Sequence, residues 1–115
     1  MYHGWSDPTV TPQMSITYYA NVIRRVGRSA GNSLVLFMVP GMGHCQGGSG
    51  TDTFDKVAAL DRWVESGQRP ASIAAAHMTN GVVERTRPLC PFPAVAVYNK
   101  NGSPDDGASF RCKKQ

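Results

Sequence analysis

An apolar run at residues 33–39, followed at once by a glycine-rich segment, constrains the fold of this chain more than any other feature. Every residue from Leu34 to Met38 is apolar, with no alternation of polar and apolar side chains. Such a run is typical of a strand covered on both faces, as in a parallel sheet flanked by helices. The next segment, residues 40–48, is Pro-Gly-Met-Gly-His-Cys-Gln-Gly-Gly. It places His44 on a loop just after a buried strand, a common position for a general base.

A helix is predicted to begin at Pro12 and to end near Gly27. Thr11 is a good N-cap residue, and proline is favoured at the first helical position. Glycine is common just past the end of a helix. Apolar side chains recur at every fourth position, namely at Met14, Tyr18, Val22 and Val26, with Tyr19 and Ile23 alongside. This spacing predicts an amphipathic helix whose apolar side faces the sheet.

A second helix is predicted after the glycine-rich loop. Asp52 can cap its start, with Asp55 three positions later, and Gly67 closes it. Its apolar side consists of Phe54, Val57, Leu60 and Val64. We expect this side to pack on the same sheet.

A β-hairpin is predicted from residues 73–78 and 82–87, which flank the dipeptide Asn80-Gly81. This dipeptide favours the tight turns that join antiparallel strands. After Pro88 the chain is expected to be irregular as far as Gln115, because prolines and a second Asn-Gly pair act there as turn formers.

Taken in order, these elements predict an α/β fold. They are a strand end, a helix, a buried strand, a loop, a second helix, a hairpin and a tail. Residues 1–7 read as the last part of a strand and the loop after it. So few parallel strands would leave a long apolar edge unpaired. With 115 residues the chain is at most one domain. We therefore expect residues 1–115 to be part of a single α/β domain whose beginning is absent.

The charge and hydropathy of the chain argue against two classes of partner. Its net charge is +4, but the basic residues are mostly scattered. The cluster of Arg24, Arg25 and Arg28 lies where cations complement the end of a predicted helix, so nucleic acid is not an expected partner. No apolar run approaches the roughly 18 residues that span a bilayer, so no membrane segment is expected.

The chain has three cysteines, so at least one of them has no partner within it. Cys90 and Cys112 flank a compact tail, rich in proline and glycine, which would gain from a disulfide. Cys45 is then left over, and it either bonds to a cysteine outside this sequence or stays a thiol. The cysteines and His44 lack the paired short spacings of a zinc site, so no metal is expected.

Asp7 and His44 occupy equivalent positions, each just past the C-terminal end of a predicted parallel strand. Side chains at these ends meet at the edge of the sheet where ligands bind in open α/β folds. A carboxylate that accepts a hydrogen bond from Nδ1 fixes the imidazole tautomer and stabilises the imidazolium formed during catalysis. The plainer alternatives are an Asx-turn for Asp7 and, for His44, a loop histidine bonded to backbone.

Three motifs occur in this chain in the same order as in a known protein family. They are Tyr-His-Gly-Trp-Ser-Asp at residues 2–7, Pro-Gly-Met-Gly-His-Cys at 40–45 and Arg-Thr-Arg-Pro-Leu-Cys-Pro at 85–91. Together they resemble the C-terminal part of the tannase and feruloyl esterase family, within the α/β-hydrolase superfamily. The resemblance runs from Tyr2 to Cys112.

The resemblance implies the last parallel strands and helices of an α/β-hydrolase fold, followed by a hairpin and a disulfide-stapled tail. It implies that Asp7 and His44 belong to a Ser-Asp-His triad. It also pairs Cys90 with Cys112, and Cys45 with a cysteine that precedes the nucleophilic serine outside this chain. The family's lid and its calcium site lie outside as well, so no cofactor is expected here. Such disulfides imply a secreted or periplasmic protein.

The nucleophile itself is absent from the sequence. Neither Gly-x-Ser-x-Gly nor Cys-Ser-x-Gly-Gly occurs, and Ser49 is expected to be a loop serine. We therefore expect the C-terminal portion of a serine carboxylic-ester hydrolase, inactive alone. With the missing N-terminal portion of the same enzyme it would act on an aromatic-acid ester. The alternative is a non-catalytic secreted fragment or interaction module that keeps the scaffold.

Four other side chains have expected roles that are mainly structural. His3 is expected to pack or hydrogen-bond locally beside the site, and His77 to lie on the surface of the hairpin. Trp63 is expected in the core beneath the second helix. Trp5 is expected to pack in a loop near the site. The sequence does not identify the substrate-binding residues.

Overall fold

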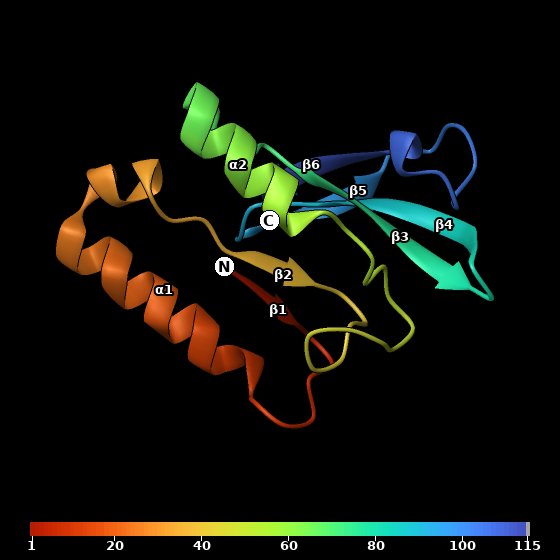
Figure 1. Ribbon diagram of the computed structural model, residues 1–115, viewed down its shortest axis with the longest axis horizontal. Helices are drawn as coiled ribbons and strands as arrows, with labels where there is room; N and C mark the ends of the chain where they lie inside the picture. Colours follow the sequence, from red (N-terminus) through yellow and green to blue (C-terminus); the bar gives the residue numbers. More distant parts are fainter. Residues whose placement is uncertain (115) are drawn as a thin grey trace.

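Two short parallel strands form the centre of the computed structural model, which describes residues 1–114 and leaves out Gln115 (Figure 1). β1 spans Tyr2–Gly4 and β2 spans Phe37–Val39. They pair in parallel, so this prediction is confirmed. β2 is shorter than the strand predicted at residues 33–39, because a 3-10 helix, Arg28–Asn32, and an irregular stretch precede it.

Helix α1, Pro12–Val26, connects the two strands and begins and ends as predicted. Gly27 ends it with a φ of 79°, a region that glycine adopts at little cost. Thr11 occupies the N-cap position, but its side chain forms no capping hydrogen bond. The fixed φ of Pro12 therefore does more to start this helix than the threonine hydroxyl does.

Helix α2, Lys56–Ser66, begins later than predicted. Its N-cap is Asp55, whose carboxylate accepts a hydrogen bond from the Ala58 amide at 2.8 Å. The prediction of Asp52 as the cap was wrong. Asp52 instead accepts a hydrogen bond from the amide of Gly47 at 2.6 Å, within the loop that carries the histidine.

The predicted inner faces of both helices are largely exposed in this chain. The side chains concerned, each more than half exposed, are Met14, Tyr18, Val26, Val57, Leu60 and Val64. On α1, Tyr19, which belongs to the predicted apolar side, meets the ring of Phe92 edge-on, with centroids 6.3 Å apart. On α2, Ala59 is buried and Trp63 packs on the core, as expected for Trp63. Each helix buries few side chains against the sheet, because two strands of three residues each offer only a small surface for packing.

Strands β3 (Ile73–Thr79) and β4 (Val82–Leu89) form the predicted hairpin. Asn80 and Gly81 both have positive φ values, 51° and 79°. A type I′ turn needs positive φ at both of its central residues, which asparagine and glycine tolerate best. The turn prediction is therefore confirmed.

The tail is more regular than the sequence suggests. β5 (Ala94–Tyr98) and β6 (Phe110–Lys114) pair in antiparallel fashion, so the prediction of an irregular segment as far as Gln115 was wrong. A second 3-10 helix lies just before β6. Pro91 and Pro93 precede β5 instead of interrupting it, so they do not prevent its pairing.

A disulfide between Cys90 and Cys112, with Cα atoms 5.5 Å apart, ties the end of the hairpin to β6 and confirms this pairing. Replacing Cys112 with serine is expected to lower the free energy of unfolding by about 3 kcal/mol, because the bond joins positions 22 residues apart. Urea titration measures this loss. Cys45→Ser is the matched control, since Cys45 is a free, exposed thiol. Equal stability of the two variants would contradict the prediction.

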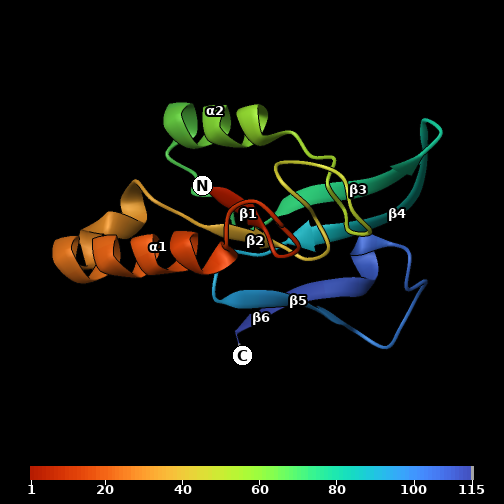
Figure 2. The same ribbon diagram turned by 90° about the horizontal axis from the view of Figure 1, so that it is seen from below.

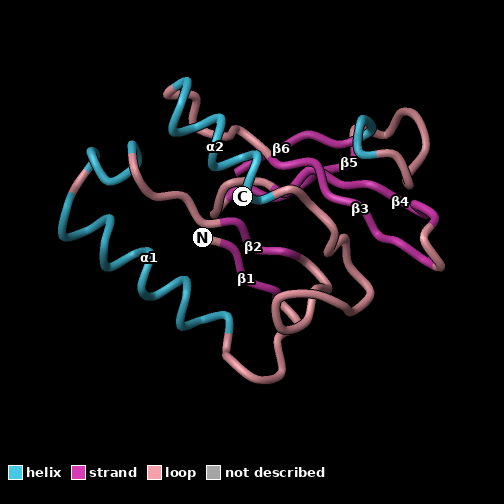
Figure 3. Tube along the Cα trace, viewed as in Figure 1, coloured by secondary structure: helices cyan, strands magenta, loops and turns pink. Residues whose placement is uncertain are grey.

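The buried core lies between the parallel strands, α2 and the β3–β4 hairpin. Figure 2 shows α2 on one side of β1 and β2, with β5 and β6 on the opposite side. The core cluster consists of Val35, Phe37, Val39, Met42, Ala75 and Leu89. In Figure 3 the loops that follow β1 and β2 emerge at the same end of the strand pair. Within residues 1–114, none of the helices has the length and apolar character needed to cross a membrane.

Candidate active site

The carboxyl ends of β1 and β2 bring Asp7 and His44 into contact. Nδ1 of His44 lies 2.8 Å from Oδ2 of Asp7, although the two residues are 37 positions apart. Asp7 follows β1 and His44 follows β2, so the parallel pairing of the strands places both at one edge. The predicted meeting of these side chains is confirmed, while their catalytic roles stay a prediction.

Asp7 uses both of its carboxylate oxygens. Oδ1 accepts hydrogen bonds from the amides of Thr9 and Val10 at 2.8 and 3.0 Å, and Oδ2 faces His44. Asp7 therefore forms the Asx-turn that is common for aspartate, and it also contacts histidine as the aspartate of a catalytic triad does. Desolvation works to raise the pKa of Asp7. Hydrogen bonds from Val10, Thr9 and His44, with the charge of His44, outweigh it and lower that pKa from 3.8 to about 2.

The contact with Asp7 leaves the other ring nitrogen of His44 free for chemistry. A carboxylate facing Nδ1 makes this nitrogen the protonated one, so the lone pair of the neutral ring lies on Nε2. The side chain of His44 is 52% exposed, whereas that of Asp7 is only 4% exposed. The pair can therefore take a proton from an alcohol brought to Nε2 and return it to a leaving group.

The end of β1 lies directly against residues 40–51, called here the histidine loop. The amide of Ser6 donates to the carbonyl of Met42 at 3.0 Å. Gly4 is buried, and a Cβ at this position would overlap the carbonyl oxygens of Met42 and Gly43. Glycine is the residue that allows backbones to approach this closely. It therefore sets the separation between the two loops that carry the candidate pair.

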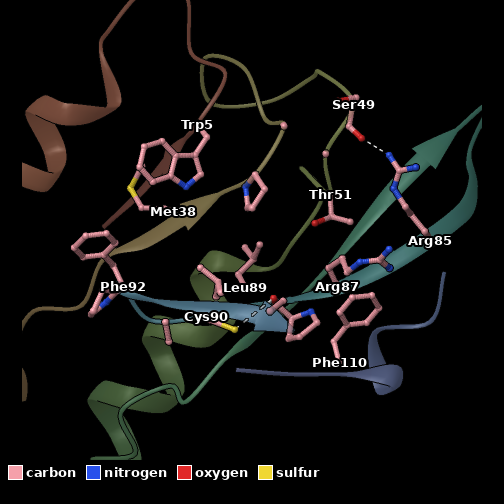
Figure 4. A pocket seen from close by; sticks show the side chains of 18 residues that line it. Trp5, Met38, Ser49, Thr51, Arg85, Arg87, Leu89, Cys90, Phe92 and Phe110 are labelled. Carbon is pink, nitrogen blue, oxygen red and sulfur yellow. Dashed lines mark hydrogen bonds between the residues drawn. The ribbon is translucent and has the colours of Figure 1, made fainter. Parts of the chain in front are cut away.

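The β3–β4 hairpin holds the other end of the histidine loop. Nδ1 of His77 lies 2.7 Å from the carbonyl oxygen of Gly50. Arg85 donates to the carbonyl of Ser49, as Figure 4 shows. The expectation that His77 lies on the surface was wrong, because its side chain is 19% exposed. No spacing in the sequence signals these contacts, since they join residues 27 and 36 positions apart.

Replacing Arg85 with methionine is expected to loosen the histidine loop. Methionine keeps much of the apolar stem but removes the charged donor, and a hydrogen bond of this kind contributes about 1.5–3 kcal/mol. We expect amide hydrogen exchange within the loop to become about tenfold faster or more, as measured by NMR, with no change in α2. Arg69→Met is the control, because Arg69 is exposed beyond α2. Unchanged exchange in the loop would refute this role.

Cys45, next to His44, is exposed and free within the described part of the chain. Its φ of 66° is uncommon for a residue other than glycine. The bond to a cysteine outside this chain stays a prediction. Residues 1–114 contain no group of three or more His, Cys, Asp or Glu side chains suited to hold a metal ion.

A cavity of about 620 Å³ lies beside the histidine loop (Figure 4). Trp5 and Phe92 line it together with Arg85 and Arg87. Trp5 lies in the turn between β1 and Asp7, and so near the candidate pair, as expected. The guanidinium of Arg87 stacks 4.0 Å from the ring centre of Phe110. The two candidate catalytic side chains do not line the cavity. Residues of the histidine loop therefore line the cavity, but Asp7 and His44 lie outside its lining.

Relatives of known description match nearly the whole of this chain. A mono(2-hydroxyethyl) terephthalate hydrolase from Piscinibacter sakaiensis is 43% identical over 115 residues, which cover 97% of this chain and 19% of that protein. A probable feruloyl esterase from Arthroderma benhamiae is 37% identical over 119 residues, covering 98% of this chain and 22% of that protein. The chain thus spans about a fifth of the length of these relatives.

Solved esterase structures share the fold. An esterase from Aspergillus oryzae matches with a TM-score of 0.81 and 28% identity, over 97% of this chain and 26% of that one. Feruloyl esterase B from Aspergillus oryzae matches with a TM-score of 0.77 and 26% identity, with the same coverage of 97% and 26%. The sequence profile described as "Tannase and feruloyl esterase" matches residues 1–113. The chain therefore belongs to the tannase and feruloyl esterase family.

Proposed function

We propose that residues 1–115 are the C-terminal part of an α/β-hydrolase domain with serine carboxylic-ester hydrolase activity. In this proposal His44 is the general base and Asp7 orients it. The hydrogen bond of 2.8 Å between His44 Nδ1 and Asp7 Oδ2, at the carboxyl ends of two parallel strands, is the observation that carries the proposal. The esterase relatives support it further.

The proposed reaction has two halves. His44 Nε2 takes the proton of a serine hydroxyl from another part of the enzyme as that oxygen attacks the ester carbonyl. The imidazolium, stabilised by Asp7, then protonates the leaving alcohol, and an acyl-serine remains. Water then loses a proton to Nε2 as its oxygen attacks the acyl carbonyl. The imidazolium returns a proton to the departing serine oxygen, and the acid is released. Asp7 stays ionised throughout, in keeping with its lowered pKa.

Esters of aromatic acids are the proposed substrates. The support comes from the names of the relatives, which include a mono(2-hydroxyethyl) terephthalate hydrolase and a probable feruloyl esterase. A secreted or periplasmic location is proposed as well, because the Cys90–Cys112 disulfide suits an oxidising compartment. We further propose that Cys45 bonds to a cysteine beside the nucleophilic serine, which would hold base and nucleophile together.

An assay of the longer protein that carries this chain tests the proposal. We expect hydrolysis of a chromogenic aryl ester, loss of activity on labelling with a serine-directed fluorophosphonate, and no turnover by residues 1–115 alone. Turnover by these residues alone, or a longer protein that neither hydrolyses aryl esters nor is labelled, would overturn the proposal. Dimerisation of the chain through Cys45 would favour an independent interaction module instead.

A further inference from the structure

A second imidazole lies beside the carboxylate of Asp7. Nε2 of His3, on β1, is 3.2 Å from Oδ2 of Asp7, the same oxygen that faces His44. The side chain of His3 is 10% exposed, so this contact is nearly closed to solvent. The proposed reaction gives His3 no part. Its local hydrogen bonds agree with the sequence-based expectation, but the contact with Asp7 goes beyond it.

The surroundings of His3 determine which of its nitrogens carries hydrogen. Nε2 is 3.2 Å from the Asp7 carboxylate and 3.1 Å from the carbonyl oxygen of Val10. Both neighbours are acceptors, so Nε2 must be the donor whether the ring is neutral or charged. Nδ1 lies 2.7 Å from Oγ of Ser15 on α1, and a hydroxyl can donate to a neutral ring nitrogen. The neutral ring is therefore the Nε2–H tautomer.

We propose that His3 is a positioning residue that holds Oδ2 of Asp7 in place for His44. Ser15 then hydrogen-bonds to Nδ1 of His3, and Nε2 of His3 donates to the carbonyl of Val10, whose own amide donates to Oδ1 of Asp7. Nε2 also lies 3.2 Å from Oδ2, the oxygen that faces His44. This inference rests on the proposed function and deepens it. It also requires the two histidines beside Asp7 to be opposite tautomers, Nε2–H in His3 and Nδ1–H in His44.

His3 supports the Asp7 carboxylate through the turn that holds it. Oδ1 of Asp7 accepts from the amides of Thr9 and Val10, and Oδ2 faces Nδ1 of His44, with Nε2 of His3 3.2 Å away. Because His3 binds the carbonyl of Val10, it holds the turn that fixes the plane of the carboxylate and, through it, the ring of His44. The groups that face the carboxylate come from β1, the Asp7 turn and the histidine loop, while α1 adds the hydroxyl of Ser15 behind His3. This arrangement matters because Asp7 and His44 both lie in loops.

Nitrogen-15 NMR of the histidine rings tests the inference directly on the 115-residue chain. In spectra recorded at a pH where both rings are neutral, we expect His3 to show a protonated Nε2 and a hydrogen-bonded, unprotonated Nδ1, with the reverse pattern in His44. His3 in the Nδ1–H form would overturn the inference. The readout requires no ester hydrolysis, so it can fail while the esterase assay succeeds, and the reverse.

Two substitutions separate positioning from simple packing. His3→Leu removes the donor, whereas His3→Gln keeps an N–H group near the place of Nε2. We expect the pKa of Asp7, followed by its carboxyl carbon-13 signal, to rise in His3→Leu, because the turn that supplies the Thr9 and Val10 amides loosens, and to rise less in His3→Gln. In the longer protein, kcat should fall about tenfold in His3→Leu with KM unchanged, and His3→Gln should recover part of it. An Asp7 titration that is unchanged in both variants would overturn the inference. If His3→Leu does not fold, the inference is overturned by an unchanged Asp7 titration in His3→Gln together with the Nδ1–H form of His3 in the native chain.

Discussion

Replacing His44 with alanine is expected to reduce kcat for aryl ester hydrolysis by the longer protein by at least about 10⁴-fold. The substitution removes the group proposed to accept the serine proton and to protonate the leaving alcohol. KM should change little, because the proposed loss is confined to the transition state. Steady-state kinetics with a chromogenic ester measure both quantities.

Two observations control this experiment. The variant should stay folded, because the His44 side chain is 52% exposed. Its free energy of unfolding should fall by only about 1 kcal/mol, because Asp7 loses one hydrogen-bond partner. Added imidazole should restore part of the activity, since it can enter the space left by the side chain. Activity within tenfold of the native protein would rule out His44 as the base.

Replacing Asp7 with asparagine is expected to lower kcat by about 10⁴-fold, through the tautomer of His44. The amides of Thr9 and Val10 point at Oδ1, so the asparagine must turn its carbonyl oxygen toward them. Its NH₂ group then faces Nδ1 of His44. This forces the imidazole to accept at Nδ1 and to carry its hydrogen on Nε2, where a base needs a lone pair.

Kinetics and ring nitrogen NMR on the Asp7→Asn variant check this prediction together. Asp61→Asn is the matched control, because Asp61 is exposed on α2 and should leave both readouts unchanged. A variant with native kcat, or with His44 still in the Nδ1–H form, would contradict the assignment.

Asp7 also gives the stability of the chain a defined acid dependence. Its pKa in the folded protein is about 2, below the ordinary value of 3.8. The folded state therefore binds protons less readily, and the stabilising effect is complete above pH 3.8 and disappears as the pH falls through 2. In Asp7→Asn, the slope of unfolding free energy against pH should be smaller in this range. Urea titrations between pH 2 and 5 compare the two proteins.

The backbone elements that the sequence predicts well are those with local signals. Pro12 and Gly27 mark both ends of α1, and Asn80-Gly81 marks the hairpin turn. The parallel pairing follows from an apolar run without alternation. The meeting of Asp7 with His44 follows from that pairing, since equivalent strand ends share an edge.

Other features depend on long-range packing and left no local signal. The apolar spacing in α1 and α2 does not say which side meets a sheet of only two short strands, so residues such as Met14 and Val64 remain exposed. β5 was not predicted, because the prolines just before it indicate turns and not a strand. The contacts of His77 and Arg85 with the histidine loop depend on the register of the hairpin, which composition cannot give.

Gly4 limits the ways in which this protein can be engineered. Exchanging glycine for alanine in an extended segment is a usual route to thermostability, because it reduces the freedom of the unfolded chain. At position 4 the exchange would push the strand away from the carbonyls of Met42 and Gly43. A saturation library at this site should therefore return glycine alone among active clones. Diversity for directed evolution is better placed at exposed helical positions such as Asp61 and Glu65 on α2.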